Sequence, residues 1–289
     1  MSFLRRLAQL AWAAALVCPL LLSSASADPP VARDPDVRVD TPHGLYVKAR
    51  GQNPRIKMVG NKVYATYMAR RYFVPMEPYF NVSVNQGATW NGADRRINRQ
   101  NPGDPAGDHS LAIPANLGDS NVYVLLISND GVQSVPSVVV STDGGATWPN
   151  ADVDLTLYDF FSRADFAIAA GSGGRAYVVW RDNTNNEQWD WSIFMRRTTD
   201  GGVTWQPKQQ INISDKPTLP PPDPRERSYQ PAICADATSK IFITWKDKRD
   251  PTNPNSFVEK PGRILTRYSV DSGNSFIPAG AEIRPDPAD

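Results

Sequence analysis

The sequence predicts an all-β fold made of four copies of one antiparallel sheet unit. An eight-residue motif of the form Ser/Thr-x-Asp-x-Gly-x-Thr-Trp recurs along the 289 residues, and an apolar segment rich in β-branched and aromatic residues precedes each copy. Segments of clear helical periodicity are absent from the sequence. A strand-rich unit that recurs in this way is typical of repeat proteins, in which each unit buries its apolar face against its neighbours.

The four copies of the motif match the pattern to different degrees. Residues 141–148 (STDGGATW) and 198–205 (TTDGGVTW) match it in full, whereas 83–90 (SVNQGATW) and 269–276 (SVDSGNSF) match it in part. The third positions, which lie 58, 57 and 71 residues apart, are Asn85, Asp143, Asp200 and Asp271.

Each copy is interpreted as a hairpin between two strands. The side-chain oxygen of the Asp or Asn can accept hydrogen bonds from N–H groups two or three residues on. The following glycine supplies the positive φ of a tight turn, and the last residue is expected to fold back as an apolar plug. These last residues are Trp90, Trp148, Trp205 and Phe276. One carboxylate per copy is too few for a calcium loop, so the motif is predicted to be structural.

Four strands are expected around each motif. In the third unit they lie at residues 166–170, 176–182, 191–198 and 207–213. The runs that combine β-branched and aromatic residues fit strands of this length. The other first strands are expected at 55–59, 111–115 and 231–235, the other second strands at 63–67, 122–127 and 241–247, and the last fourth strand at 280–284.

The motif resembles the Asp-box, or bacterial neuraminidase repeat, of the sialidase superfamily. This resemblance implies a β-propeller of four-stranded antiparallel blades over residues 53–289, with four recognisable Asp-box blades. Sialidases have six blades, so a four-bladed ring, a five-bladed ring with one degenerate blade and a truncated gene product remain open. Residues 28–52 are expected to form a partial blade or to close the ring. An unclosed propeller would expose two sheet edges and would be expected to dimerise or aggregate.

Residues 1–27 have the pattern of a secretory signal peptide. Arginines precede an apolar run at 7–22, and the small residues 25–27 offer a cleavage site. Gln9 and Pro19 interrupt the run, so no stable membrane span is expected after cleavage. We therefore expect a secreted or periplasmic protein.

The composition narrows the choice of partners. The chain carries 31 Lys and Arg against 30 Asp and Glu, and this balance argues against nucleic acid as a partner. Cys234 is the only cysteine left after signal cleavage, which excludes an internal disulfide. His43 and His109 lie far apart in the sequence, without further ligands at useful spacing. No metal and no cofactor are predicted.

The resemblance also points to arginines that would bind a carboxylate of the ligand. Sialidases carry an Arg-Ile-Pro motif on the first strand of the first blade, and residues 55–57 (Arg-Ile-Lys) occupy that place. Aligning the first strands sets Ala112, Ala167 and Ala232 beside Arg55. A guanidinium matches a carboxylate bidentately, so Arg55 is the leading ligand-binding candidate; the alternative is an ordinary arginine at a strand start. Arg70 falls where the family has its next arginine, and Arg163, Arg181, Arg225 or Arg227 could complete the set.

Sialidase chemistry uses a tyrosine nucleophile with a glutamate partner, and here Tyr229 with Glu226 is the nearest match. The family's acid/base Asp is missing from the loop at residues 71–80, which contains only Glu77. A glycosidase that uses two carboxylates is a further alternative, for which Asp165, Asp182, Glu187, Asp190 and Asp247 are available. Asp182 and Asp247 recur at equivalent positions, which favours a structural role for both.

The loop at residues 183–191 (NTNNEQWDW) interleaves amide side chains with two tryptophans, as sugar-binding surfaces do. Trp191 is expected to begin a strand and pack inside. Trp189 is therefore the candidate for stacking on a pyranose ring.

Two functions from different classes remain. The predicted function is that of an exported, noncatalytic propeller that binds glycans or an exported protein partner through its rim loops. The alternative is a sialidase-like exo-glycoside hydrolase in which Arg55 binds an anionic sugar. The missing acid/base Asp favours the first, and whether the protein is an enzyme stays open.

Overall fold

The structure, a computed structural model, describes residues 39, 50–70, 76–97, 106–116, 118–129, 134–149, 153–155, 165–183, 191–212, 228–238, 240–248 and 262–278. All of these residues belong to the unit Val37–Asp289. They form four antiparallel sheets, which confirms the all-β prediction. The described part holds no helix that is long and apolar enough to cross a membrane. The predicted signal peptide lies outside the described residues.

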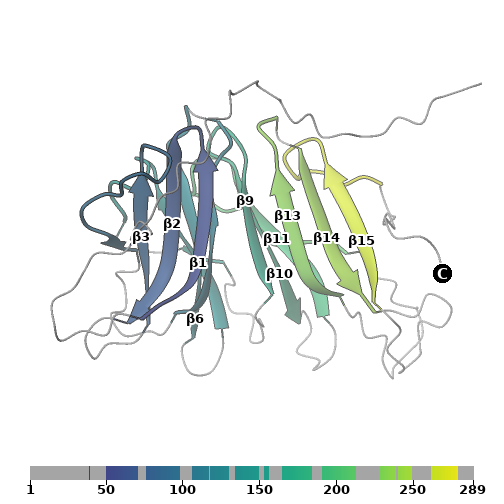
Figure 1. The fold of residues 1–289 in the computed structure, drawn as a ribbon. Coiled ribbons are helices and arrows are strands. Elements are labelled where there is room, and N and C mark those ends of the chain that lie inside the picture. Colours follow the sequence, from purple (N-terminus) through teal and green to yellow (C-terminus); the bar gives the residue numbers. More distant parts are fainter. Residues whose placement is uncertain are drawn as a thin grey trace, which may run out of the picture. The chain divides into compact units, whose positions relative to one another are not determined.

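Each sheet is built from strands that are consecutive in the sequence (Figure 1). Sheet 1 comprises β1 (Arg50–Val59), β2 (Lys62–Arg70), β3 (Glu77–Ser83) and β4 (Arg95–Arg96). Sheet 2 comprises β5 (Ala106–Ala112), β6 (Val122–Asn129), β7 (Ser134–Ser141) and β8 (Val153–Asp154). Sheet 3 comprises β9 (Phe166–Ala170), β10 (Ala176–Asn183), β11 (Trp191–Thr198) and β12 (Gln209–Gln210). Sheet 4 comprises β13 (Ser228–Ala235), β14 (Ile241–Asp247) and β15 (Arg263–Ser269).

Several boundaries differ from the predicted ones, among them that of β5, which was predicted at 111–115. Strand β1 begins at Arg50, so the predicted division after residue 52 falls inside the first strand. The fourth strand predicted at 207–213 is reduced to β12. The strand predicted at 280–284 lies outside the described residues and stays a prediction. Within the described residues, sheet 4 also has an isolated bridge between Tyr268 and Ile277.

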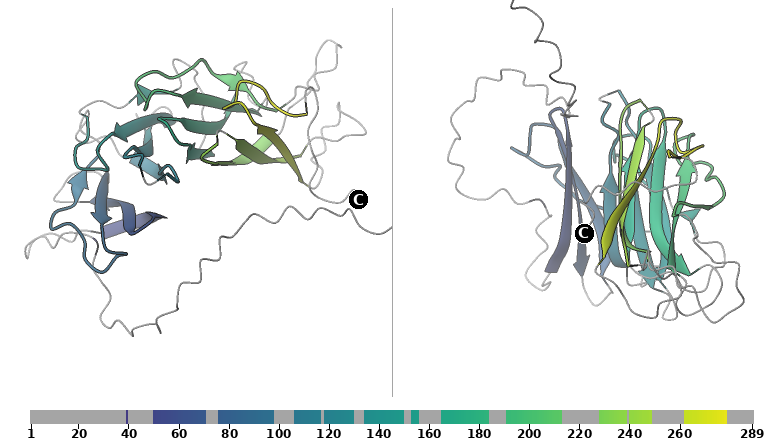
Figure 2. Two further views of the ribbon diagram at one scale, coloured as in Figure 1. Left: turned by 90° about the horizontal axis from the view of Figure 1, so that it is seen from above. Right: turned by 90° about the vertical axis from the view of Figure 1, so that its right-hand side faces the viewer.

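The sheets pack face to face in sequence order, as the view from above shows (Figure 2). We call the face that meets the next sheet the forward face, and the face that meets the preceding sheet the rear face. Side chains alternate along a strand, so β10 sends Tyr177 and Val179 toward sheet 4 and Val178 and Trp180 toward sheet 2. All four side chains are fully buried. Burial of such an apolar side chain contributes about 1.5–3 kcal/mol, so the three junctions between sheets form the core.

A network of hydrogen bonds closes each motif hairpin. In the third copy the Thr198 hydroxyl donates to Asp200 Oδ1 (2.7 Å) and accepts from the N–H of Gly202 (3.0 Å). Asp200 accepts from both the N–H and the hydroxyl of Thr204 (3.0 and 2.5 Å). The same network surrounds Asp143 and Asp271. The network of Asn85 differs in one bond, because Nδ2 of Asn85 donates to the Thr89 hydroxyl (2.8 Å).

The expected bond from an N–H two or three residues on is thus correct in part, because the N–H three residues on also acts on Asp143, Asp200 and Asp271. The Asp or Asn reaches four residues on, because the turning chain brings the seventh motif residue beside the third. Hydrogen bonds from Thr204 and Thr198 lower the pKa of Asp200 from 3.8 to about 2.

The motif is also a contact between sheets. Gly202 has a φ of +91°, and a Cβ built on it would lie 2.6 Å from Cγ2 of Val140 on the preceding sheet. Trp205, in the same copy, is buried in the cluster that joins sheets 2 and 3. In the first copy a Cβ on Gly87 would meet nothing within 4 Å, and Trp90 is only partly buried. The first motif thus lacks the contact that the later copies make.

Val39 lies on the rear face of sheet 1. It packs against Tyr67, Ala69 and Tyr79, and its carbonyl accepts a hydrogen bond from Asn81 Nδ2 (2.7 Å). Residues 28–38 and 40–49 lie outside the described residues, so a partial blade or a ring closure by this segment stays a prediction.

Candidate functional site

The first strand of three sheets contains an irregularity near its start. The register shifts between Gln52 and Arg55 in β1, between residues 106 and 108 in β5, and between Tyr229 and Ala232 in β13. In β1 and β13 the shift contains a non-glycine residue of positive φ, Asn53 (49°) and Gln230 (50°), followed by a proline. Bulges bend a strand and redirect its side chains, and they are frequent next to binding sites.

The bulge of β13 lies within a polar cluster between sheets 3 and 4. In antiparallel sheets, first strands begin where second strands end, so this edge brings together Asp165 before β9, Arg181 near the end of β10, Tyr229 near the start of β13 and Lys248 after β14. We call these four residues the rim cluster. Its members come from segments that are up to 83 residues apart in the sequence.

Asp165 fixes the geometry of the rim cluster. One of its carboxylate oxygens lies 3.4 Å from Nε of Arg181 and accepts a hydrogen bond from the N–H of Gln230 (3.2 Å). The Asp165 carbonyl also accepts from the N–H of Arg181 (3.2 Å). Asp165 therefore ties the start of β13 to the end of β10.

Two cations lie over the Tyr229 ring. The guanidinium carbon of Arg181 is 4.9 Å from the ring centroid, and Nζ of Lys248 is 5.2 Å from it. Contacts of this kind contribute about 0.5–1 kcal/mol at exposed sites. Among the described residues, the cluster therefore holds two positive groups over one aromatic ring, together with one carboxylate, and such an arrangement suits an acidic ligand.

The structure brings Arg181 and Tyr229 of the predicted set together, and it places Arg55 on sheet 1. Arg55 is partly exposed, and its guanidinium donates to the neighbouring Pro54 carbonyl (3.4 Å). The observed register makes Ser110, not Ala112, the residue of sheet 2 at the position equivalent to Arg55, because the predicted alignment was shifted by two residues in that sheet.

Glu77 is buried in an ion pair. Its carboxylate lies 2.8 Å from Nη2 of Arg96 and accepts a hydrogen bond from the Tyr79 hydroxyl (3.4 Å). This environment gives Glu77 a structural role. Arg70 ends β2, but its side chain, like all of Glu226 and Trp189, lies outside the described residues.

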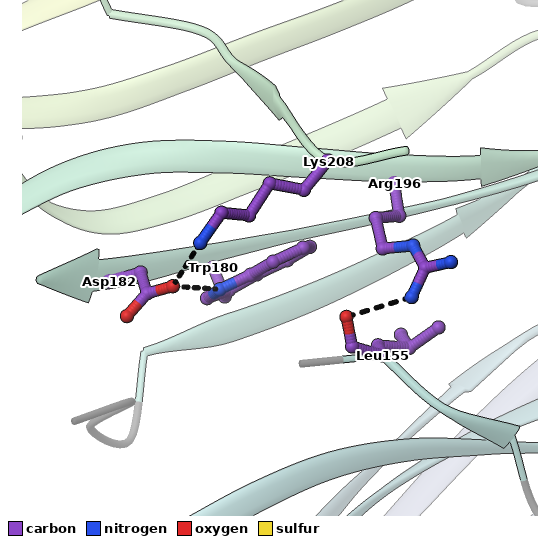
Figure 3. Close-up of polar contacts among 5 residues, drawn as sticks. All are labelled: Leu155, Trp180, Asp182, Arg196 and Lys208. Carbon is purple, nitrogen blue, oxygen red and sulfur yellow. Dashed lines mark hydrogen bonds and ion pairs between the residues drawn. The ribbon is translucent and has the colours of Figure 1, made fainter. Parts of the chain in front are cut away.

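Asp182 and Asp247, the repeated carboxylates, are both fully buried. Asp182 lies 3.2 Å from Nζ of Lys208 and accepts from Trp180 Nε1 (3.4 Å), as Figure 3 shows. Asp247 lies 3.6 Å from Nη2 of Arg263. Burial lowers the pKa of Lys208. The repetition therefore reflects an internal ion pair near the end of β10 and of β14, which is the structural role that the repeat pattern favours.

A buried arginine that binds three backbone carbonyls lies beside the ion pair of Asp182 and Lys208. Arg196 is buried and donates to the carbonyls of Leu155 (3.0 Å), Trp205 (3.0 Å) and Gln206 (2.9 Å). The bond to Leu155, drawn in Figure 3, connects sheet 3 to sheet 2. Within the described ranges, no group of three His, Cys, Asp or Glu side chains is placed to hold a metal ion.

Lys248 is the member of the rim cluster that the sequence did not single out as a residue, although the loop at 247–262, rich in Asp, Asn, Pro and Lys, is predicted to be a second rim element. It directly follows the repeated Trp-Lys-Asp segment of β14, and its proximity to Tyr229 depends on the pairing of β13 with β14. Asp165 was considered as one of several carboxylates, but its contacts to Arg181 and Gln230 could not be derived from the sequence.

No family model and no curated protein matches the sequence. Among solved structures, an α-L-arabinanase from Penicillium chrysogenum is 15% identical with a TM-score of 0.53, and the match covers 86% of this chain and 70% of that one. A protein of unknown function from Dyadobacter fermentans is 14% identical with a TM-score of 0.50, over 86% of this chain and 71% of that one. A sialidase from Trypanosoma rangeli is 19% identical with a TM-score of 0.48, and the match covers 79% of this chain and 38% of that one. The likeness to the arabinanase supports a propeller-like fold.

Proposed function

We propose that this protein is an exported, noncatalytic propeller of the Asp-box type that binds an acidic glycan through the rim cluster. The observation that carries the proposal is the pair of cations, Arg181 and Lys248, over one tyrosine at the edge where sheets 3 and 4 meet. The likeness of the fold to an arabinan-degrading enzyme favours a saccharide as the ligand.

Each residue of the rim cluster has a defined task in this proposal. Arg181 and Lys248 bind the carboxylate of the sugar, and the ion pair between Asp165 and Nε of Arg181 fixes the orientation of the guanidinium. Tyr229 supports both cations. Positive groups held in place before binding lose little side-chain entropy when the ligand arrives.

A noncatalytic role is favoured by the state of the nearby carboxylates. Asp182 and Asp247 are fully buried and ion-paired, and Asp165 is engaged by Arg181 and Gln230. A glycosidase that uses two carboxylates needs one as acid and one as base or nucleophile, both in reach of the glycosidic bond. Among the described residues of this edge, these carboxylates serve the packing of the sheets.

The test measures binding of sialylated, uronate-containing and neutral oligosaccharides to the signal-cleaved protein by calorimetry. Arg181→Met and Lys248→Met should each weaken binding of the acidic glycan by roughly 10- to 100-fold, the equivalent of about 1.5–3 kcal/mol for a hydrogen bond to a charged group. Lys62→Met is the matched control, because Lys62 is an exposed lysine at the start of a second strand, whereas Lys248 follows the end of one. Equal binding of acidic and neutral glycans, or equal losses in all three variants, would reject the proposal.

Hydrolysis is the second candidate function, and one observation favours it: the structure brings together Tyr229 and Arg181, a candidate nucleophile and a candidate ligand-binding arginine. The wild-type protein and Tyr229→Phe should be compared on fluorogenic sialoside and arabinofuranoside substrates. Turnover that is present in the wild type and lost in Tyr229→Phe, while glycan binding persists, would establish an enzyme. Absence of turnover in folded wild-type protein supports the binding role.

A further inference from the structure

The three junctions between sheets use the same positions each time. On the forward face an aromatic residue of the second strand is buried against the next sheet: Tyr64 in sheet 1, Tyr123 in sheet 2 and Tyr177 in sheet 3, with exposed fractions of 4%, 0% and 0%. Phe242 occupies the same position in sheet 4 and is 43% exposed. The forward face of sheet 4 thus carries the residue for a junction that none of the described sheets makes with it.

The first strands show the complementary pattern on the rear faces. The pairs Leu111 and Ile113, Ile168 and Ala170, and Ile233 and Ala235 belong to the apolar clusters that join each sheet to the preceding one. In sheet 1 the equivalent pair is Ile56 and Met58, whose exposed fractions are 65% and 66%. Val39 covers the part of this face around Tyr67 and leaves the β1 side exposed.

We propose that the forward face of sheet 4 binds the rear face of sheet 1 of a second copy of this chain. This contact would repeat the interface already present three times within the molecule, because it sets Phe242 against Ile56 and Met58 as Tyr123, for example, is set against sheet 3. The forward face is suited to it: Phe242 stacks on Tyr268 at 5.4 Å, and Ile264 on the same face is 41% exposed. The first motif contributes its open side, where Gly87 meets nothing within 4 Å.

The contact joins two different surfaces, so it is heterologous. One copy then offers a free Phe242 face and a free Met58 face at the same time. Association therefore continues either until a ring closes or into a growing chain.

The experiment uses sedimentation velocity of the signal-cleaved protein from about 1 to about 100 µM, the range in which weak interfaces dissociate. The wild type should associate as the concentration rises. Phe242→Glu and Met58→Glu should each weaken association at least tenfold while circular dichroism shows an unchanged fold, because both side chains are exposed. Val203→Glu, which changes an 80% exposed residue outside both faces, should associate as the wild type does.

Mixing distinguishes this contact from other arrangements. Phe242→Glu keeps an intact Met58 face and Met58→Glu keeps an intact Phe242 face, so an equimolar mixture should form a dimer that neither variant forms alone. A wild type that is monomeric throughout the range overturns the proposal. So does a mixture that stays monomeric, and so does a Met58→Glu variant that associates like the wild type, which would indicate pairing between two copies of sheet 4.

Discussion

Replacing a motif glycine with alanine has two energetic costs, backbone strain at positive φ and a clash of the new Cβ with neighbouring side chains. The second cost differs between the motifs of different sheets. Gly87, Gly202 and Gly273 all have a positive φ, at 84°, 91° and 79°. Alanine in that region costs about 1–2 kcal/mol from the clash of its Cβ with its own backbone. All three substitutions share this cost.

The surroundings of the three glycines set the remaining cost. A Cβ at position 87 meets nothing within 4 Å, whereas at position 202 it lies 2.6 Å from Cγ2 of Val140. Val140 is β-branched and stiff at χ1, so overpacking should add about 1–3 kcal/mol. At position 273 the nearest atom is Cε of Met195, 2.9 Å away, and a flexible methionine can move aside at lower cost. The expected order of destabilisation is Gly202→Ala, then Gly273→Ala, then Gly87→Ala.

Urea unfolding followed by circular dichroism measures the series, since the midpoint reports stability when the slope is unchanged. Gly202→Ala should lower the free energy of unfolding by about 2–5 kcal/mol, and Gly87→Ala by about 1–2 kcal/mol. Equal losses for these two variants would refute the reasoning, because the motif glycine would then serve the turn alone and not the junction between sheets.

Two further predictions concern hydrogen bonds made by charged side chains of the fold, Asp200 and Arg196. Hydrogen bonds from Thr204 and Thr198 hold the pKa of Asp200 near 2, below its ordinary 3.8, so its stabilisation is complete above about pH 4 and is lost as the pH falls through 2. Asp200→Asn should fold, because Asn85 closes the first motif with equivalent contacts, in which its Nδ2 donates to the Thr89 hydroxyl where Asp200 accepts from the Thr204 hydroxyl. The thermal midpoint of Asp200→Asn should fall less between pH 4 and pH 2 than that of the wild type, and an equal fall would contradict this account. Arg196→Lys should lose about 2–4 kcal/mol of unfolding free energy, since a compact ammonium cannot reach three carbonyls that a guanidinium fork spans, and a urea midpoint within error of the wild type would disprove that role.

The candidate site shows where prediction from sequence fails. Tyr229 and Arg181 were chosen separately, one as a nucleophile and one as an arginine of a triad, and their contact appears only when β13 pairs with β14 beside sheet 3. Glu77 was chosen for its loop, but β3 and β4 place it next to Arg96 and bury it. Lys248 carried no signal of its own.

The sequence by itself determined the turns and the strands, because these depend on residues close together in the chain. The network from Thr198 to Thr204 needs only one eight-residue motif, and the alternation of Tyr177 and Val178 assigns each side chain to a face without knowledge of the neighbouring sheets. Only the tertiary structure decided which surfaces meet. The stacking of whole sheets brings Gly202 close to Val140. It also buries Tyr177 and leaves Phe242 exposed at the equivalent position. Equivalent positions in a repeat differ only through the neighbours that the fold gives them.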